Sequence, residues 1–422
     1  MWQAEVGPRP ISARRPEAKV EIEFGKQKQG GRLRVWPERL VMARWLGMPL
    51  LLFVVTRLGI ALIAYLAVPL INDSLTPPPY HLRGADNVLL DVFGSRWDSG
   101  FYISIVEEGY QFAGVPLPSV AFFPLLPLLM RLALPLVGDA VVAGILVSNL
   151  ALLLTAVLFY RLVAESHSPA MAGRAVWYLL IFPTAFFGTA VYSESLFLLT
   201  TIGSWYFARH GRWGAAGLLA AAAGLTRLVG VVVIPLLAWE WWRQMRGREG
   251  GKRPALFTLP LVLAPLAGIG VFIVYLWRVF GDPLAFVHGA AAWARQPQSV
   301  LVTVADLLQK PVGGWGTAVL AGQIHIDNWL DFSLALFFLA LGLVLLRKKR
   351  YGEAAFVLLG VLIPLNSGLL MSLRRYVWVL FPAFILLAEW GERPWVDKVI
   401  TTFSLLGLAL FTALFANGYW VG

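Results

Sequence analysis

Residues 45–70 read WLGMPLLLFVVTRLGIALIAYLAVPL, an apolar run interrupted by a single charged side chain, Arg57. About 20 apolar residues in a helix cross the roughly 30 Å hydrocarbon core of a membrane. Similar runs recur along the whole chain, in which 58% of 422 residues are hydrophobic and 14% are charged. Soluble proteins carry about 45–50% apolar and about 25% charged residues. The sequence therefore predicts an all-α, polytopic membrane protein.

About eleven segments are apolar enough to be interpreted as membrane spans, although three of them are short. Their approximate bounds are 45–70, 140–161, 174–190, 195–208, 214–225, 228–242, 255–278, 329–346, 353–371, 376–391 and 398–416. The basic segment 1–44 precedes them and is predicted to be a partly disordered cytoplasmic extension. The transmembrane domain then comprises residues 45–422.

Basic residues in short loops predict the orientation, because such loops stay on the cytoplasmic side. These loops are RHGR at 209–212, RQMRGREGGKR at 243–253 and RKKR at 347–350. The segment 71–137 contains six acidic residues and few basic ones before Arg131. We therefore place this segment outside, together with the long gap 279–328.

This orientation requires residues 121–137 to lie at the outer interface, which their three prolines and Arg131 favour. The alternative is an additional short span, which would invert the following loops. Segments 97–110 and 283–295 are too short and polar to cross the membrane. Their Trp and Tyr side chains are typical of interfacial helices.

The composition argues against several other classes of protein. The net charge of +11 does not predict a nucleic-acid partner, because ten Lys and Arg fall in the first 44 residues and basic segments beside spans attract membrane lipids. The chain has no cysteine, no phosphate-binding glycine motif and no clustered metal ligands. No cofactor is predicted, and a divalent metal is compatible with the sequence but not predicted.

The first external segment contains RWDSGFYISIVEEGY at residues 96–110. In a helix, Asp98, Tyr102 and either Ile105 or Val106 share one face. A partly desolvated carboxylate there could accept a proton from an attacking hydroxyl. Asp98 could instead cap the helix or be a solvated loop charge.

Charged residues at other predicted outer turns suggest a phosphate-binding site near this carboxylate. They are Glu194 in YSES, Arg227 in GLTR, and Arg374 and Arg375 in SLRRY. Arginine binds phosphate oxygens in a bidentate manner. Each arginine could instead extend its side chain to the lipid headgroups. The Glu194 carboxylate could instead stabilise the start of a helix through the helix dipole. His288 in segment 283–295 is either structural or part of the same site.

Six sequence blocks together resemble the PIG-V family, which includes the second mannosyltransferase of GPI-anchor assembly and bacterial relatives. In order they are RWDSGFYISIVEEGY, AFFPLLP, FPTAFFGTAVYSESLFLL, GLTRLVGV, GDPLAFVHGAAAW and SLRRYVWVLFP, within about residues 45–390. The absence of cysteine and the short loops favour a prokaryotic relative. The resemblance implies a GT-C-type fold, with interfacial helices and a catalytic carboxylate in the first external loop.

By this resemblance Asp98 is the catalytic base. The candidate substrate-binding residues are Arg96, Trp97, Tyr102, Tyr192, Glu194, Arg227, His288, Arg374 and Arg375. The loop carries a single WD instead of a DxD pair, and Asp91 could join Asp98 only through folding. No metal site is therefore assigned.

The predicted function is that of an inverting membrane glycosyltransferase. It would transfer a mannosyl (hexosyl) residue from a polyprenyl- or dolichyl-phosphate sugar to a lipid-linked or glycan acceptor. The active site would face outward, at the plasma membrane if the chain is bacterial. The alternatives are a transporter or lipid flippase, which would place charges near the bilayer midplane, and a noncatalytic partner of such an enzyme, which the presence of Asp98 disfavours.

Overall fold

The computed structural model describes residues 26–29, 32–35, 38–71, 87–247, 254–292, 298–308, 326–368 and 370–421. The chain divides into two compact units, Met1–Leu46 and Gly47–Gly422. In the first unit, strands β1 (Lys26–Gln29) and β2 (Arg32–Val35) pair in antiparallel fashion. Most of the segment 1–44 lies outside the residues whose side chains the structure describes, so its predicted partial disorder stays a prediction.

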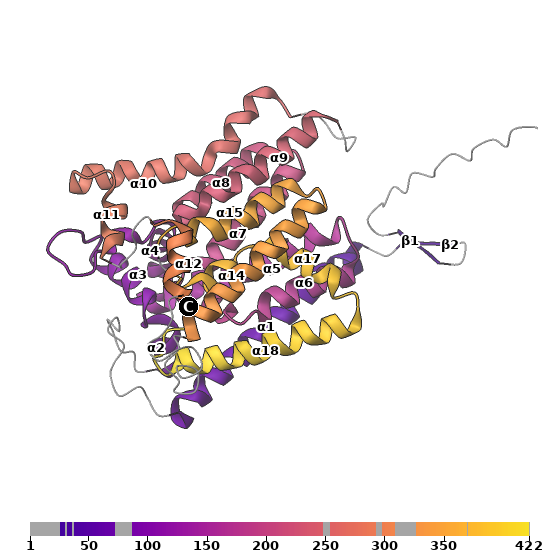
Figure 1. The fold of residues 1–422 in the computed structure, drawn as a ribbon. Helices are drawn as coiled ribbons and strands as arrows, with labels where there is room; N and C mark the ends of the chain where they lie inside the picture. The colour runs from indigo at the N-terminus through magenta and orange to yellow at the C-terminus, as the bar shows by residue number, and fades with distance from the viewer. Residues whose placement is uncertain are drawn as a thin grey trace, which may run out of the picture. The chain divides into compact units, whose positions relative to one another are not determined.

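The second unit is helical throughout its described part (Figure 1). Its elements, with the first helix starting before the boundary, are α1 Glu38–Leu70, α2 Val88–Gly94, α3 Asp98–Glu107, η1 Ser119–Ala121, α4 Leu125–Val137, α5 Ala140–Ala164, α6 Pro169–Ile181, η2 Ala185–Gly188, α7 Glu194–Arg209, α8 Trp213–Thr226, η3 Leu228–Val232, α9 Val233–Met245, η4 Leu256–Leu263, α10 Ala264–Phe280, α11 Ala285–Ala291, α12 Val300–Leu308, α14 Ile326–Arg347, α15 Tyr351–Leu365, α16 Leu373–Trp378, α17 Phe381–Trp390 and α18 Pro394–Ala416.

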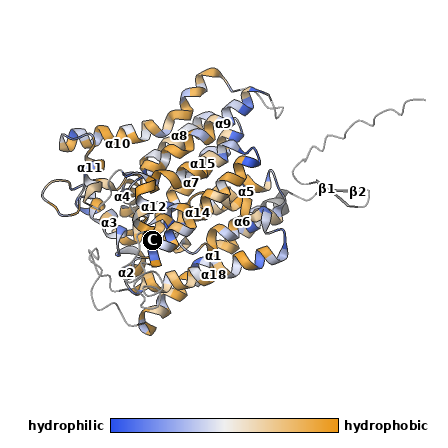
Figure 2. Ribbon diagram, in the orientation of Figure 1, coloured by the Kyte–Doolittle hydropathy of each residue, from blue (hydrophilic) through white to orange (hydrophobic). Residues whose placement is uncertain are grey.

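Among the residues that the structure describes, five helical segments are long and apolar enough to cross a membrane, and Figure 2 colours hydrophobic residues orange. They are Trp45–Leu70, Ala140–Ala164, Leu256–Phe280, Ile326–Arg347 and Pro394–Ala416. Each agrees with a predicted span, so the predicted all-α polytopic membrane fold is confirmed. The number of eleven spans stays a prediction.

Two predicted spans are interrupted at prolines. Helix α6 ends at Ile181, and Phe182 takes an extended backbone with ψ 145° just before Pro183. Proline disfavours a helical conformation in the residue before it, which explains this end. The predicted span 376–391 likewise divides into α16 and α17, with Pro382 in the first turn of α17.

Helices α8 and α10 approach each other closely because glycines lie at their contact. A Cβ atom on Gly224 would come within 2.1 Å of the Pro265 carbonyl oxygen, and one on Gly268 within 2.0 Å of the Ala221 carbonyl oxygen. Small residues permit such backbone contact between membrane helices. This contact helps to hold the C-terminal end of α8, from which Arg227 follows.

Helix α4 forms most of the segment 121–137, for which the sequence left open an interfacial helix or an additional span. It is an apolar helix of 13 residues whose Arg131 donates to the carbonyl oxygens of Ile105 (2.8 Å) and Val106 (3.1 Å). These bonds tie α4 to the C-terminal end of α3. The interfacial position of α4 stays a prediction.

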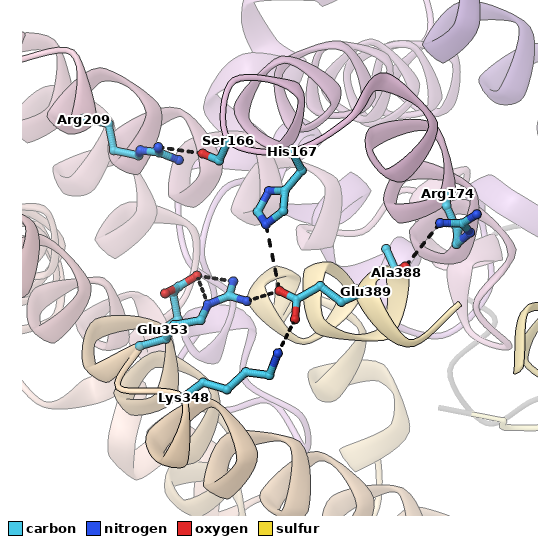
Figure 3. Close-up of polar contacts among 9 residues, drawn as sticks. Ser166, His167, Arg174, Arg209, Lys348, Glu353, Ala388 and Glu389 are labelled. Carbon is cyan, nitrogen blue, oxygen red and sulfur yellow. Dashed lines mark hydrogen bonds and ion pairs between the residues drawn. The ribbon is translucent and has the colours of Figure 1, made fainter. Parts of the chain in front are cut away.

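Residues of the predicted cytoplasmic loops 209–212 and 347–350 lie near the loop after α5, where His167 Nε2 is 4.0 Å from Glu389 Oε1 (Figure 3). Glu389 Oε2 accepts from Lys348 Nζ at 2.6 Å, and Glu389 Oε1 accepts from Arg350 at 2.6 Å. Arg209, the last residue of α7, donates to Ser166 at 2.8 Å. The loops after α5, α7 and α14 therefore share one polar end, and α7 leads from it to Glu194 at its other terminus.

Candidate active site

Helix α3 presents Asp98 as its first residue. The preceding Trp97 has φ +56°, a left-handed conformation that is costly for a residue with a side chain and is found at functional sites. The N-cap position belongs to Trp97 and has no side-chain cap bond. The Asp98 carboxylate is directed to another element, so the helix-cap interpretation does not describe it.

Asp98 Oδ2 accepts a hydrogen bond from Arg375 Nη1 of α16 at 2.6 Å. The Asp98 side chain retains 21% of its exposure, whereas that of Arg375 retains 6%. Arg375 Nε also lies 3.1 Å from Glu194 Oε1, and Arg227 Nη1 forms a second ion pair with that oxygen. The result is an alternating charge cluster of Asp98, Arg375, Glu194 and Arg227.

The cluster forms because helix ends converge. Glu194 is the first residue of α7, where a carboxylate is favoured by the helix dipole. Arg227 is the C-cap residue of α8 with an extended backbone, φ −160° and ψ 148°. Arg375 lies in the six-residue α16, which follows Ser372 at φ +77°. Three of the four charges therefore lie at helix ends, and Arg375 lies within the short α16.

Aromatic rings surround the two cations of the cluster. The guanidinium carbon of Arg375 lies 5.2 Å from the ring centroid of Tyr192, and that of Arg227 lies 4.7 Å from the ring centroid of Tyr376. Tyr192 also accepts a hydrogen bond from the Asp98 backbone N–H at 3.3 Å. Cation–π contacts of this kind are strengthened by desolvation. The rings therefore confine the guanidinium groups and limit their access to water.

Burial keeps two phenols near the cluster neutral. Desolvation and the nearby Asp98 carboxylate raise the pKa of Tyr192 well above its usual value. Desolvation also raises the pKa of Tyr102, against the opposing effect of its hydrogen bond with Ser193. Desolvation lowers the pKa of Arg375, but Asp98 and Glu194 outweigh it, so this pKa lies well above its usual value. At neutral pH the cluster therefore presents cationic arginine beside neutral phenols.

Three predicted site residues, Arg96, Arg374 and His288, form their ion pairs outside the charge cluster. Arg96 pairs with Asp91 at 2.7 Å and donates to the Ala416 carbonyl oxygen at 2.6 Å. Asp91 is thus engaged by Arg96. Within the part of the chain that the structure describes, no group of three or more His, Cys, Asp or Glu could hold a metal ion.

Arg374 and His288 also belong to separate pairs. Arg374 binds Asp331 at 2.9 Å and Asp327 at 2.8 Å, and its side chain is almost fully buried. His288 lies 2.6 Å from Asp282 and is 59% exposed. The structure thus brings together Asp98, Tyr102, Tyr192, Glu194, Arg227 and Arg375, with Trp97 beside Asp98.

Sequence reasoning missed Trp420, which follows α18 near the end of the chain. Its ring lies 5.0 Å from that of Trp97 and 5.4 Å from the guanidinium carbon of Arg375, measured between centroids and from centroid to carbon. Trp420 falls outside the blocks that carry the family resemblance and beyond the last predicted span. Because Trp420 is far from Trp97 in the sequence, no local sequence pattern predicts that the two rings lie close together.

Several solved structures are similar to this chain. Among them are the oligosaccharyltransferase of Archaeoglobus fulgidus tethered with an acceptor peptide (TM-score 0.40, 13% identity, 89% of this chain and 55% of that one) and the same organism's AglB with an inhibitory peptide and a dolichol-phosphate (TM-score 0.40, 13% identity, 89% and 56%). A third is the Archaeoglobus fulgidus enzyme with Zn and sulfate (TM-score 0.39, 13% identity, 88% and 53%). The chain spans about half the length of these proteins.

No curated protein gives a significant match to the chain. A family model does match, and its description is Mannosyltransferase (PIG-V). The match covers α3, α7 and the turn at Arg227, which carry three of the four charges in the cluster. Residues 40–245 therefore match the PIG-V mannosyltransferase family, which confirms in this part of the chain the resemblance inferred from the sequence.

Proposed function

We propose that this protein is a membrane glycosyltransferase with a GT-C-type fold. It transfers a mannosyl (hexosyl) residue from a polyprenyl- or dolichyl-phosphate sugar to a hydroxyl of a lipid-linked or glycan acceptor. The observation that carries the proposal is the pairing of a partly exposed carboxylate, Asp98, with the buried Arg375 in one charge cluster. The mannosyltransferase family match over residues 40–245 supports the reaction class.

Asp98 is the group that we assign as base. The acceptor hydroxyl gives its proton to the Asp98 carboxylate while its oxygen forms a bond to the anomeric carbon. The bond from this carbon to the phosphate oxygen breaks, and its electron pair leaves with the carrier phosphate. A single displacement inverts the configuration and requires one base, unlike the two close carboxylates of retaining glycosidases. Arg375 holds the Asp98 carboxylate in position for this step.

Arg227 is the group that we assign to the donor phosphate. Its side chain retains 13% of its exposure and borders a small pocket whose other lining includes the apolar Phe197, Val229 and Leu380. A phosphate on an apolar carrier needs a cation next to an apolar surface. Arg227 meets this requirement and can stabilise negative charge on the leaving phosphate. Arg374 has no such role in the proposal, since Asp327 and Asp331 engage it.

The positions of the charges favour an enzyme over a transporter or flippase. Asp98 and Glu194 each begin a helix, and Arg227 follows one. Functional charges of transporters lie near the bilayer midplane. We place the charge cluster on the outer side, because the other end of α7 meets the basic loops that the positive-inside rule assigns to the cytoplasm.

The proposal predicts that the purified full-length protein uses a lipid-phosphate sugar. Incubated in detergent or nanodiscs with radiolabelled polyprenyl-phosphate mannose, it should transfer the label or release free mannose, with loss of the lipid-linked label. GDP-mannose is the control donor and should remain unused. Use of GDP-mannose in place of the lipid donor would contradict the proposed substrate class.

Replacing Arg227 by glutamine should weaken use of the donor. We expect kcat/KM for the lipid-phosphate sugar to fall about 10²-fold, through a higher donor KM and a lower kcat, since Arg227 is assigned both to binding the donor phosphate and to stabilising its charge as it leaves. The measurement is initial rates at varied donor concentration. Arg278→Gln, at an exposed position on α10, is the matched control and should leave KM unchanged. A kcat loss without a change in KM would remove Arg227 from donor binding.

A further inference from the structure

The backbone of Arg374 is held on both sides by side chains that lie outside the charge cluster. Asp331 Oδ1 accepts from the Arg374 backbone N–H and from its Nε, each at 2.9 Å. The Thr184 hydroxyl donates to the Arg374 carbonyl oxygen at 3.0 Å. Both Thr184 and Asp331 are almost completely buried. The two peptide groups that flank Arg374 are therefore each fixed by another element: Asp331 binds the one before Arg374, and Thr184 binds the one that leads into Arg375.

These two anchors come from rigid parts of the fold. Asp331 lies in the second turn of α14, a helix of 22 residues. Thr184 lies between α6 and η2, where the chain breaks at Pro183. Arg57 of α1 secures this break, since it donates to the carbonyl oxygens of Leu180 (3.0 Å) and Ala185 (2.9 Å). The Thr184 hydroxyl therefore has a defined place despite lying outside a helix.

Helix α16 needs such external support. It contains six residues and follows Ser372 in a left-handed conformation. A helix this short gains little from its own hydrogen bonds, because nucleation is costly. Yet Arg375 must reach Asp98 at 2.6 Å and Glu194 at 3.1 Å at once. A small rotation of the 374–375 peptide would move the guanidinium away from one of these carboxylates.

We propose that Thr184 and Asp331 are positioning residues, which act on the reaction through Arg375 by fixing the Arg374 backbone. The inference rests on the proposed function, in which Arg375 holds the catalytic base. Neither residue contacts Asp98. Their effect should therefore fall on kcat, while donor KM, assigned to Arg227, stays the same.

The first test is Thr184→Val, which keeps the side-chain shape and removes the hydroxyl. We expect kcat to fall about tenfold, since misplacement by fractions of an ångström slows reactions strongly, with donor KM within about twofold of wild type. Thr184→Ser restores the hydroxyl and should recover kcat. Thr201→Val is the matched control, because Thr201 is equally buried but donates to the Phe197 carbonyl oxygen inside α7. It should leave kcat unchanged.

Asp331→Asn provides a second variant that retains an oxygen acceptor for the Arg374 N–H and removes the charge. Because the Arg374 N–H keeps its acceptor while the bond from Nε is weakened, we expect a smaller fall in kcat than in Thr184→Val, with donor KM unchanged. Thermal melting of every variant separates this effect from global destabilisation. Equal losses of kcat in Thr184→Val and Thr201→Val, or no recovery in Thr184→Ser, would overturn the positioning role.

A double-mutant cycle with Arg375→Gln distinguishes failure of this inference from failure of the proposed function. If Thr184 acts through Arg375, Thr184→Val should lower the residual rate of Arg375→Gln by less than about twofold. A full tenfold further loss would overturn the inference and leave the proposed function intact. Wild-type activity in the Arg375→Gln single variant would instead remove Arg375 from the mechanism.

Discussion

Asp98→Asn should lower kcat by about 10²- to 10⁴-fold, the range that general acid–base catalysis contributes. Asparagine keeps the size of the side chain and can still accept a hydrogen bond from Arg375, but it cannot take a proton from the acceptor hydroxyl. Donor KM should change little, because Arg227 is the assigned phosphate contact. The measurement is transfer from labelled polyprenyl-phosphate mannose at saturating donor.

Stability should be preserved in this variant. Asp98 is partly exposed, and Arg375 keeps Glu194 as a second carboxylate partner. The matched control is Asp139→Asn, since Asp139 is an exposed N-cap of α5 and asparagine caps helices equally well. Asp139→Asn should retain full activity. Turnover by Asp98→Asn that equals that of this control would exclude Asp98 as the base.

Glu194→Gln should destabilise the protein by about 3–5 kcal/mol, the cost of removing one partner from a buried ion pair. The Glu194 side chain is 1% exposed and lies between two arginines. Arg375 would keep Asp98, but Arg227 would lose its ion pair with the carboxylate while remaining near the aromatic ring of Tyr376. The free energy of unfolding, measured by chemical denaturation in detergent, reports this change.

A second substitution can test the cause of that loss. The double variant Glu194→Gln with Arg227→Gln removes both charges and should recover part of the stability, because no cation is then left uncompensated. Glu240→Gln is the matched control: Glu240 is equally buried, and its hydrogen bond from Gln244 (2.8 Å) can persist with an amide. A loss in Glu194→Gln no larger than in this control would argue against a stabilising charge cluster.

Much of the fold could be predicted from the lengths of apolar runs. The predicted spans 45–70 and 329–346 agree with helical segments to within a few residues. The lengths of the runs did not predict the breaks inside two of them, at Pro183 and just before Pro382. A hydropathy average taken over the whole run does not reveal a break of this kind, although the helix ends there.

The site was predictable in its residue types but not in its pairings. Asp98 and Arg375 are 277 residues apart in the chain, so only the orientation of the helices could place them on one side. Neighbouring helical residues point about 100° apart. The sequence SLRRY does not indicate which of its two arginines binds Asp98. In the structure Arg375 binds Asp98 and Arg374 binds Asp331.

Helix α7 also bears on where the acceptor must come from. Its 16 residues correspond to about 24 Å, less than the roughly 30 Å of a hydrocarbon core. If Arg209 lies at the cytoplasmic headgroups, as the proposed orientation implies, Glu194 would lie below the opposite headgroup level. The reacting sugar would therefore have to descend into the edge of the bilayer. An acceptor with its own lipid anchor would already lie at this depth and would not have to leave bulk water to react.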